Sequence, residues 1–446
     1  MWSEERMGAH RARQTGPGWT WRRCAVWAVL AVVVGLWQGP DFVRSMRPRR
    51  DYLCDFVQEW ASARNLIDGR PIYEDQEISL ARYLDFHRDP ENPTDRFFLR
   101  VNAHPPTSVL LAVPLAWLDY PDAVLTWNML SLLALAVSLW LMNRHLRITS
   151  SPWALLPLMT FLLLCGPFRQ QVIQGQLNLM LLLLLTGTWA ADRSGRPLLA
   201  GVLLGTATAI KLFPGFLLLY FLLRRDWKAA AAAVVWSAIL TALTAGLVGT
   251  AAYRDYASEV VPQVGAAFVS SWWNASLAGF WSRLFNPATD QHHVLPLWQN
   301  PLLAQTGMLL SRLAVVALLV RVVPRARTPA EQDLAFGLVL VGMLLVSPLT
   351  WDHYFLLLPL PVVLLWQRLP PGGIARWLFA VIPVILSLNL KWFFNLTVPG
   401  GWPGGTAGPV QTLTVVALPF YALLALFVVG VVILWRHAGE ARQAAS

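Results

Sequence analysis

Three ionisable side chains lie within or beside long apolar stretches of this sequence. Asp55 opens the stretch DFVQEW, Lys211 lies in ATAIKLFPG between two apolar runs, and His353 lies in SPLTWDHYF. A carboxylate that is partly shielded from water has a raised pKa and is a stronger base toward a hydroxyl group. Ammonium and imidazolium groups are suited to phosphate oxygens. These residue types therefore predict base-assisted attack on a group carried by a phosphate.

Each of these residues also has a structural alternative. Asp55 could cap or begin the helix that follows it, and Glu59, one turn later, competes with it for the role of base. Lys211 could extend to the membrane surface, and SPLTWDHYF could be a hydrated turn between two helices. An ammonium at this depth is costly, however, and favours a functional role. Pro214 and Gly215 break the apolar run behind Lys211, as expected of a junction that forms a site.

The stretch FRQQVIQGQLN adds a group of amides. Gln171, Gln174 and Asn178 recur at i, i+3 and i+7, which predicts that they share one helix face. Gly175 on that face would allow close approach of a backbone or ligand, and Arg169 lies beside it. Such amides either bond neighbouring helices or bind a hydroxyl-rich, anionic ligand. We expect Arg169 to contact phosphate and the three amides to contact a sugar or the acceptor.

Further candidates come from three other loops. His104 precedes two prolines, which fix an extended entry into the next helix and are expected to direct His104 toward substrate, unless its role is structural. In SSWWN, Trp273 is a candidate for sugar stacking or for the interfacial belt, and Asn274 is a candidate for sugar or acceptor binding. Asp352 is expected to orient an imidazole such as that of His353, and joins the sugar or acceptor set with Glu59.

The composition predicts that membrane-spanning helices position these residues. Hydrophobic residues make up 56% of the 446 residues, charged residues 13%, and the mean hydropathy is +0.48. A soluble domain carries about 25% charged residues. We predict an all-α polytopic membrane protein with about twelve transmembrane helices, several shorter than the usual span. The net charge of +10 comes from arginines in short loops, which indicates membrane topology and not nucleic-acid binding.

The positive-inside rule predicts which loops lie on the cytoplasmic side of the membrane. With the N-terminus in the cytoplasm, every predicted inner loop is basic, provided that 106–118 is an interfacial or re-entrant helix and not a span. We expect polar tails at 1–20 and 437–446, both cytoplasmic, and one membrane domain over 21–436. Its first outer loop, 41–121, carries surface and re-entrant helices. All the candidate residues then gather on the outer, periplasmic or extracellular, face.

The absence of several known motifs limits the classes of substrate and cofactor that we expect. The sequence has no phosphate-binding Gly-x-x-x-x-Gly-Lys loop, no dinucleotide fingerprint, no His-Glu-x-x-His and no Asp-x-Asp pair. We therefore expect no cofactor, no dedicated metal site and no soluble nucleotide sugar. A lipid-phosphate donor presented from the bilayer fits the remaining features.

The quoted stretches, in order, resemble glycosyltransferase family 87, membrane enzymes of the GT-C fold. The matching segments include DFVQEWASARNLIDGRPIY, HPPTSVLLAVPLAWL, GQLNLMLLLLL, LAGVLLGTATAIKLFPG, WNASLAGFWSRLF and SPLTWDHYFLLLP. HPP stands where Tyr-Pro-Pro is common in the family, and WDHY stands where a second His often follows. The resemblance runs from about residue 50 to residue 370 and rests on the order of segments that are individually weak.

The resemblance implies an inverting transfer of a hexose, mannose at the family level, from a polyprenyl-phosphate donor to a lipid or glycan hydroxyl. Asp55 would be the catalytic base. Lys211, His353 and Arg169 would stabilise the phosphate that leaves. A transporter or flippase is the main alternative, although it would more naturally show internal repeats and ionisable residues near the bilayer midplane. A non-catalytic lipid-binding scaffold is a second alternative, and it does not account for Asp55, Lys211 and His353 together.

Overall fold

A computed structural model describes residues 19–50, 52–87, 100–149, 151–287 and 294–443. The predicted N-terminal polar tail therefore lies largely outside the described residues, as does part of the predicted first outer loop, whereas most of the predicted C-terminal tail is described as the end of a helix. The described residues form helices and no strand, apart from one isolated bridge between Val294 and Ala407. The predicted all-α class is confirmed.

Six described helices are long and apolar enough to cross a membrane. They are α2 (Trp21–Met46), α6 (Tyr120–Leu146), α12 (Trp227–Val248), α16 (Pro301–Val322), α17 (Pro329–Val346) and α23 (Leu418–Gln443). Local signals fix their starts: Thr328 and Glu331 form a capping box at α17, and the Asn300 side chain caps α16. The protein is therefore a polytopic membrane protein.

Two further helix pairs are bent and would raise the number of spans in the described segments to eight if each pair crosses once. These are α7 (Leu155–Leu164) with α8 (Gly166–Gln174), bent by 68°, and α19 (Ile374–Ser387) with α20 (Leu390–Thr397), bent by 89°. The predicted number of about twelve spans stays a prediction.

The remaining helices are shorter. Several predicted spans correspond to such pieces: α9 (Asn178–Arg193), α10 (Pro197–Ile210), η4 (Phe213–Leu217) with α11 (Leu218–Leu223), and η7 (Asp352–Leu357) with α18 (Pro359–Trp366). The segment predicted as an interfacial or re-entrant helix, 106–118, contains α5 (Pro106–Ala112) and η2 (Val113–Leu115). The others are α3 (Val57–Ile67), α4 (Gln76–Leu84), η3 (Pro152–Ala154), α13 (Thr250–Asp255), the π-helix η5 (Tyr256–Val260), α14 (Val261–Phe268), α15 (Leu277–Phe285), η6 (Val323–Arg325), α21 (Gly401–Gly404), α22 (Pro409–Gln411) and the π-helix η8 (Thr412–Val416).

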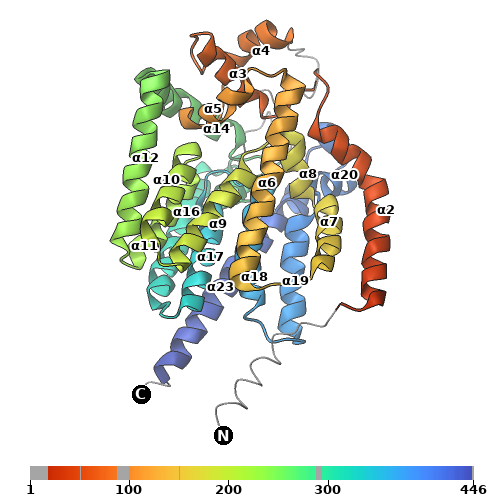
Figure 1. The fold of residues 1–446 in the computed structure, drawn as a ribbon, viewed down its shortest axis with the longest axis vertical. Coiled ribbons are helices and arrows are strands. Elements are labelled where there is room, and N and C mark those ends of the chain that lie inside the picture. Colours follow the sequence, from red (N-terminus) through yellow and green to blue (C-terminus); the bar gives the residue numbers. More distant parts are fainter. Residues whose placement is uncertain (1–18, 51, 88–99, 150, 288–293, 444–446) are drawn as a thin grey trace.

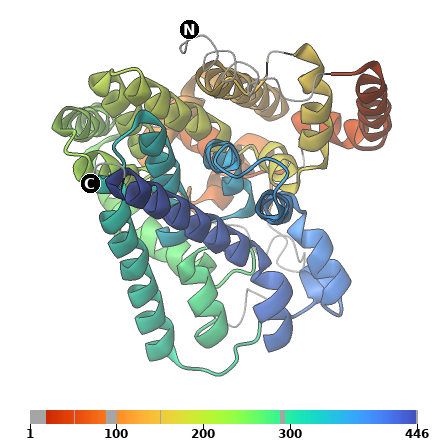
Figure 2. The same cartoon turned by 90° about the horizontal axis from the view of Figure 1, so that it is seen from below.

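The segment predicted as the first outer loop covers one end of the bundle (Figure 1). Figure 1 shows α3 and α4 at the top, whereas α2 begins and the described part of α23 ends at the opposite end. Seen from below, α2 stands at the periphery of the bundle (Figure 2). The segment predicted as a surface helix is helical as α3: Phe56, Trp60 and Ala63 are buried at helical spacing, and Gly69 follows with a positive φ of 68°. Its place on the outer membrane surface stays a prediction.

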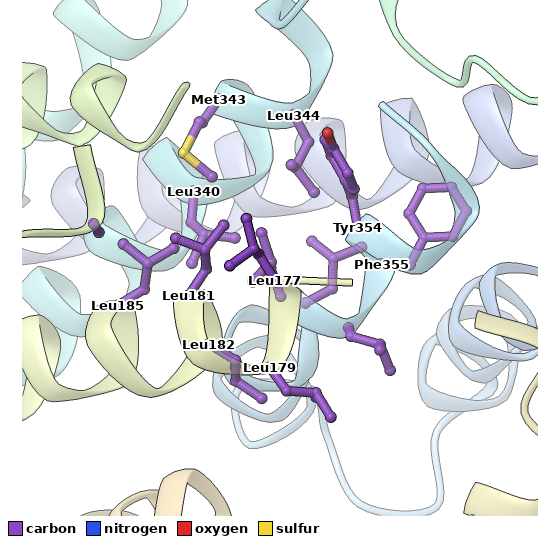
Figure 3. Close-up of a cluster of buried hydrophobic side chains, with 14 of the residues drawn as sticks. Leu177, Leu179, Leu181, Leu182, Leu185, Leu340, Met343, Leu344, Tyr354 and Phe355 are labelled. Atoms are coloured by element: carbon purple, nitrogen blue, oxygen red, sulfur yellow. The ribbon is translucent and has the colours of Figure 1, made fainter. Parts of the chain in front are cut away.

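Leucines of α9, with its N-cap Leu177, form part of the hydrophobic core next to the segment that carries His353. Side chains between Leu177 and Leu185 pack against Leu340, Met343 and Leu344 of α17, with Tyr354 of η7 at one side (Figure 3). On another side, Gly201 and Gly205 let α10 approach α12 closely, because a Cβ on Gly201 would lie 2.4 Å from the Ala229 carbonyl oxygen.

Candidate active site

Asp55 lies against the turn between α8 and α9. Its Oδ2 accepts a hydrogen bond from Gln176 Nε2, and the next residue, Phe56, donates its backbone N–H to the Gln174 carbonyl oxygen at 3.1 Å. Tyr120 Oη accepts from the Cys54 backbone N–H at 2.8 Å. Helix α3 has no side-chain cap, so Asp55 does not serve as the cap that one reading of the sequence proposed. Its carboxylate instead faces residues distant in sequence.

Gly175 makes this contact feasible. It ends α8 in the left-handed region, with φ of 62°, and its carbonyl accepts from Trp127 Nε1 at 2.8 Å. Because Gly175 ends the helix, Gln171, Gln174 and Asn178 do not share one helix face, and that prediction was wrong. The i, i+3 and i+7 spacing defines one face only within a continuous helix, and Gly175 ends the helix between Gln174 and Asn178.

Two of these amides, Gln171 and Asn178, are nevertheless joined by hydrogen bonds. The Gln171 side chain is buried, donates from Nε2 to the Gln176 carbonyl oxygen, and accepts at Oε1 from Asn178 Nδ2 at 3.2 Å. This relay fixes the backbone of Gln176, whose own amide bonds Asp55. Our reading of the sequence missed Gln176, although it lies in the polar GQLN segment. Gln174 contributes its carbonyl to the same turn.

The surroundings of Asp55 make it basic. Burial raises the pKa of Asp55, and the nearby Glu59 carboxylate raises it further. The His353 imidazole, the Gln176 hydrogen bond and the His104 imidazole oppose this shift. The carboxyl group is therefore in a setting suited to a general base that holds a proton more tightly than an exposed Asp.

Glu59 and His104 form a second carboxylate–imidazole pair. His104 Nδ1 bonds Glu59 Oε1, and the two side chains are only 11% and 3% exposed. Tyr73 donates its hydroxyl to the His104 carbonyl oxygen at 2.7 Å, which fixes the entry to the Pro-Pro segment. Both predicted residues thus lie beside Asp55, with Glu59 committed to His104.

Lys211 is buried, being 7% exposed, so the surface-reaching alternative is not realised. Its Nζ lies 4.5 Å from the ring centroid of Tyr354 and 5.8 Å from that of Phe213. These two rings stack at 5.1 Å. The carboxylates of Glu59 and Asp55 interact electrostatically with Lys211. The cation is therefore held close to the carboxylates while packing against aromatic faces.

The two ring nitrogens of His353 have different surroundings. Its Nδ1 lies 3.3 Å from Asp352 Oδ1, and that oxygen also accepts from the His353 backbone N–H at 2.7 Å. Nε2 is buried and has no hydrogen-bond partner within the described ranges. The Trp351 ring lies parallel at 6.4 Å. Asp352 thus orients the imidazole as expected and leaves Nε2 available to a ligand.

Three other predicted residues bond groups outside this cluster. Arg169 donates from Nη1 to Gln38 Oε1 at 2.6 Å, which ties α8 to α2. Trp273 stacks on Trp272 at 4.3 Å and meets Trp351 edge-on at 6.5 Å. Asn274 makes all its side-chain hydrogen bonds to backbone groups.

Within the described part of the chain, no three His, Cys, Asp or Glu residues are arranged to hold a metal ion. The expectation of no metal and no cofactor stays a prediction. What the structure brings together is a carboxylate base candidate, a carboxylate–imidazole pair, a buried ammonium and an oriented imidazole, from four separate segments. Such a set can deprotonate a hydroxyl and stabilise a leaving anion.

An all-α membrane protein with this acid–base cluster belongs to the class of membrane-embedded group-transfer enzymes. The sequence model of glycosyltransferase family 87 matches residues 102–348, and the chain belongs to this family. It is therefore a membrane glycosyltransferase, and the transporter alternative is not favoured.

Curated relatives are similar over most of the chain. One is a polyprenol-phosphate-mannose-dependent alpha-(1-2)-phosphatidylinositol mannoside mannosyltransferase of Mycolicibacterium smegmatis, 28% identical over 97% of this chain and 94% of the relative. The protein of the same description from Mycobacterium tuberculosis is 27% identical over 86% of both chains. A Mycolicibacterium smegmatis phosphatidylinositol pentamannoside mannosyltransferase is 28% identical over 68% of this chain and 70% of the relative.

Proposed function

We propose that this protein transfers a mannosyl group from a polyprenyl-phosphate donor to a hydroxyl of a phosphatidylinositol-mannoside-like lipid, with inversion. The names of the relatives support the donor and the acceptor class. The observation that carries the proposal is the half-buried Asp55 carboxylate, bonded by Gln176 and surrounded by His104, His353 and Lys211.

In the proposed reaction, Asp55 takes the proton of the acceptor hydroxyl as its oxygen attacks the anomeric carbon. The bond from that carbon to the donor phosphate breaks, and the electron pair leaves with the phosphate. Lys211 and His353 Nε2 stabilise the negative charge that develops there. Glu59 and His104 line the acceptor side. Arg169, whose guanidinium bonds Gln38, would contribute at longer range.

We infer that the site opens to the outer face and that both termini are cytoplasmic. The basic loops support this orientation, as does the position of α3 and α4 at the end opposite the start of α2 (Figure 1). One core cluster extends from Met46 to Leu434, which supports a single domain over 21–436. Labelling of single cysteines at Asp85 and Arg225 with a membrane-impermeant reagent in intact cells tests the orientation. Labelling at position 225 and not at 85 would reverse it.

The central experiment measures transfer of labelled mannose from polyprenyl-phosphate mannose to phosphatidylinositol mannosides by purified protein. Asp55→Asn removes the base and keeps the shape, and we expect transfer to fall by about 10³-fold or more. Asp85→Asn is the matched control, because this carboxylate is 98% exposed in the same outer loop. Equal transfer by Asp55→Asn and wild type would overturn the assignment of the base.

A panel of other polyprenyl-phosphate sugars separates the choice of sugar from the reaction class. Transfer of a different hexose, still dependent on Asp55, would correct the donor and keep the mechanism. No transfer with any donor, together with uptake of a labelled solute by proteoliposomes, would overturn the proposed reaction for this chain.

A further inference from the structure

The turn that precedes α15 is bonded to the segment that carries His353. Asn274 Nδ2 donates to the carbonyl oxygens of Val269 and Pro348, both at 2.9 Å. Its Oδ1 accepts from the backbone N–H of Ser276 at 3.1 Å and of Thr350 at 2.9 Å. A side-chain amide has two N–H groups and two oxygen lone pairs. All four are used, so the Asn274 amide has no hydrogen bond left for a sugar.

Neighbouring groups strengthen the same junction. The Ala275 backbone N–H donates to the Thr350 carbonyl oxygen at 2.8 Å, and Ser276 Oγ donates to the Pro348 carbonyl oxygen at 3.2 Å. Thr350 Oγ1 donates back to Leu344 in α17 at 2.6 Å. Asn274, Ser276 and Thr350 are fully buried. We call this set of bonds between 274–276 and 348–350 the Asn274 clasp.

Arg283 holds the clasp from the side of α15. Its side chain is 1% exposed, and Nη1 donates to the carbonyl oxygens of Ser271 at 2.8 Å and Asn274 at 2.5 Å. Helix α15 is pressed onto the turn, since a Cβ on Gly279 would lie 2.3 Å from the Asn274 carbonyl oxygen. Burying a guanidinium is costly, and these two bonds are what this one makes among the described residues. Its placement therefore fixes the turn.

The clasp ends immediately before Trp351, Asp352 and His353. The His353 ring has an unpartnered, buried Nε2, and its orientation depends on Asp352 and on the parallel Trp351 ring. Trp273, within the clasped turn, meets Trp351 edge-on. A small rotation of 348–350 would therefore displace the imidazole.

We propose that Asn274 and Arg283 are positioning residues, which hold the 347–353 segment so that His353 Nε2 is fixed for the donor phosphate. This inference rests on the proposed function for the identity of the ligand, and on the hydrogen bonds above for the positioning. It replaces the expectation that Asn274 binds a sugar or the acceptor. Neither residue touches substrate in this scheme.

The kinetic test compares Asn274→Ala, His353→Ala and the double variant. We expect Asn274→Ala to lower kcat/KM for the polyprenyl-phosphate donor by about 10- to 100-fold, with the acceptor KM unchanged. In the His353→Ala background, Asn274→Ala should have little further effect, because the residue acts through His353. Asn300→Ala is the control for a lost asparagine hydrogen bond elsewhere: it removes the cap of α16, a loss of about 1 kcal/mol, without touching the clasp. Independent, multiplying effects of Asn274→Ala and His353→Ala would overturn the inference.

A second readout needs no catalysis. In a Cys24→Ser background, a cysteine placed at His353 should react slowly with maleimide, because the His353 side chain is 9% exposed. We expect Asn274→Ala or Arg283→Met to increase that rate by about tenfold or more, and Asn300→Ala to leave it unchanged. An unchanged rate in all variants would overturn the positioning role. Absence of transfer in wild type, with the labelling rates shifted as expected, would overturn the proposed function and keep the clasp.

Discussion

A Cβ placed on Gly175 would lie 2.7 Å from the Cβ of Phe56. The turn after α8 and the residues just before α3 therefore meet at backbone distance, with Asp55 beside the contact and its carboxylate bonded to Gln176. The residues just before α3 thus pack into the turn that holds the candidate base.

Gly175→Ala should destabilise the protein strongly. The left-handed φ of 62° and the contact with Phe56 both oppose a side chain, and together they should cost about 3 kcal/mol or more. Gly195→Ala is the matched control, because Gly195 has a φ of 68° and nothing within 4 Å of its Cβ position. Thermal unfolding in detergent compares the two. Equal shifts would mean that the contact with Phe56 contributes nothing beyond the backbone strain.

Gln176→Leu should weaken catalysis and change its pH dependence. The hydrogen bond from Gln176 lowers the pKa of Asp55 against the effect of burial, so its loss raises that pKa further. Asp55 acts as a base only when ionised. The acidic limb of the kcat/KM profile should therefore move to higher pH, with a loss of about tenfold or more below it. An unshifted limb would show that Gln176 does not hold the ionised carboxylate.

The sequence predicted the class of fold and most of the cluster because both depend on local patterns. Long apolar runs gave the membrane helices, and Asp55, Lys211 and His353 stood out as ionisable groups in apolar surroundings. The partners could not be predicted in the same way. Gln176 bonds Asp55, which lies 121 residues earlier in the sequence, and Asn274 bonds the segment at 348–350. Such pairings follow from tertiary packing, which no short-range periodicity encodes.

The amide stretch shows how a local pattern misleads. A helical period joins Gln171, Gln174 and Asn178 only if the helix continues, and Gly175 ends it in the left-handed region. A bend also complicates the number of crossings: α7 and the more polar α8 reach membrane-spanning length only when taken together, and they are bent by 68°.

Asp333→Asn should affect stability and leave the active site intact. Asp333 in α17 accepts from Trp189 Nε1 at 2.8 Å and pairs with Arg193, while the candidate site begins beyond the other end of the helix, about 20 Å away. The loss should be about 2 kcal/mol, because Arg193 stays partly exposed and solvent screens the pair. Thermal unfolding should show the shift, with KM for donor and acceptor unchanged. A changed KM would indicate coupling through α17.

Lys211→Met should remove most of the stabilisation of the leaving phosphate. The ammonium is buried against Tyr354 and Phe213, and among the described residues it has no direct salt bridge, so its charge is available to an anion. We expect kcat/KM for the donor to fall by about 10²- to 10³-fold while thermal stability rises or stays equal, because methionine fills the same volume without a buried charge. Lys228→Met is the matched control, since Lys228 is exposed on α12. If Lys211→Met kept donor kcat/KM within about threefold of wild type, the phosphate would have to be stabilised elsewhere, and His353 and Arg169 would become the groups to test.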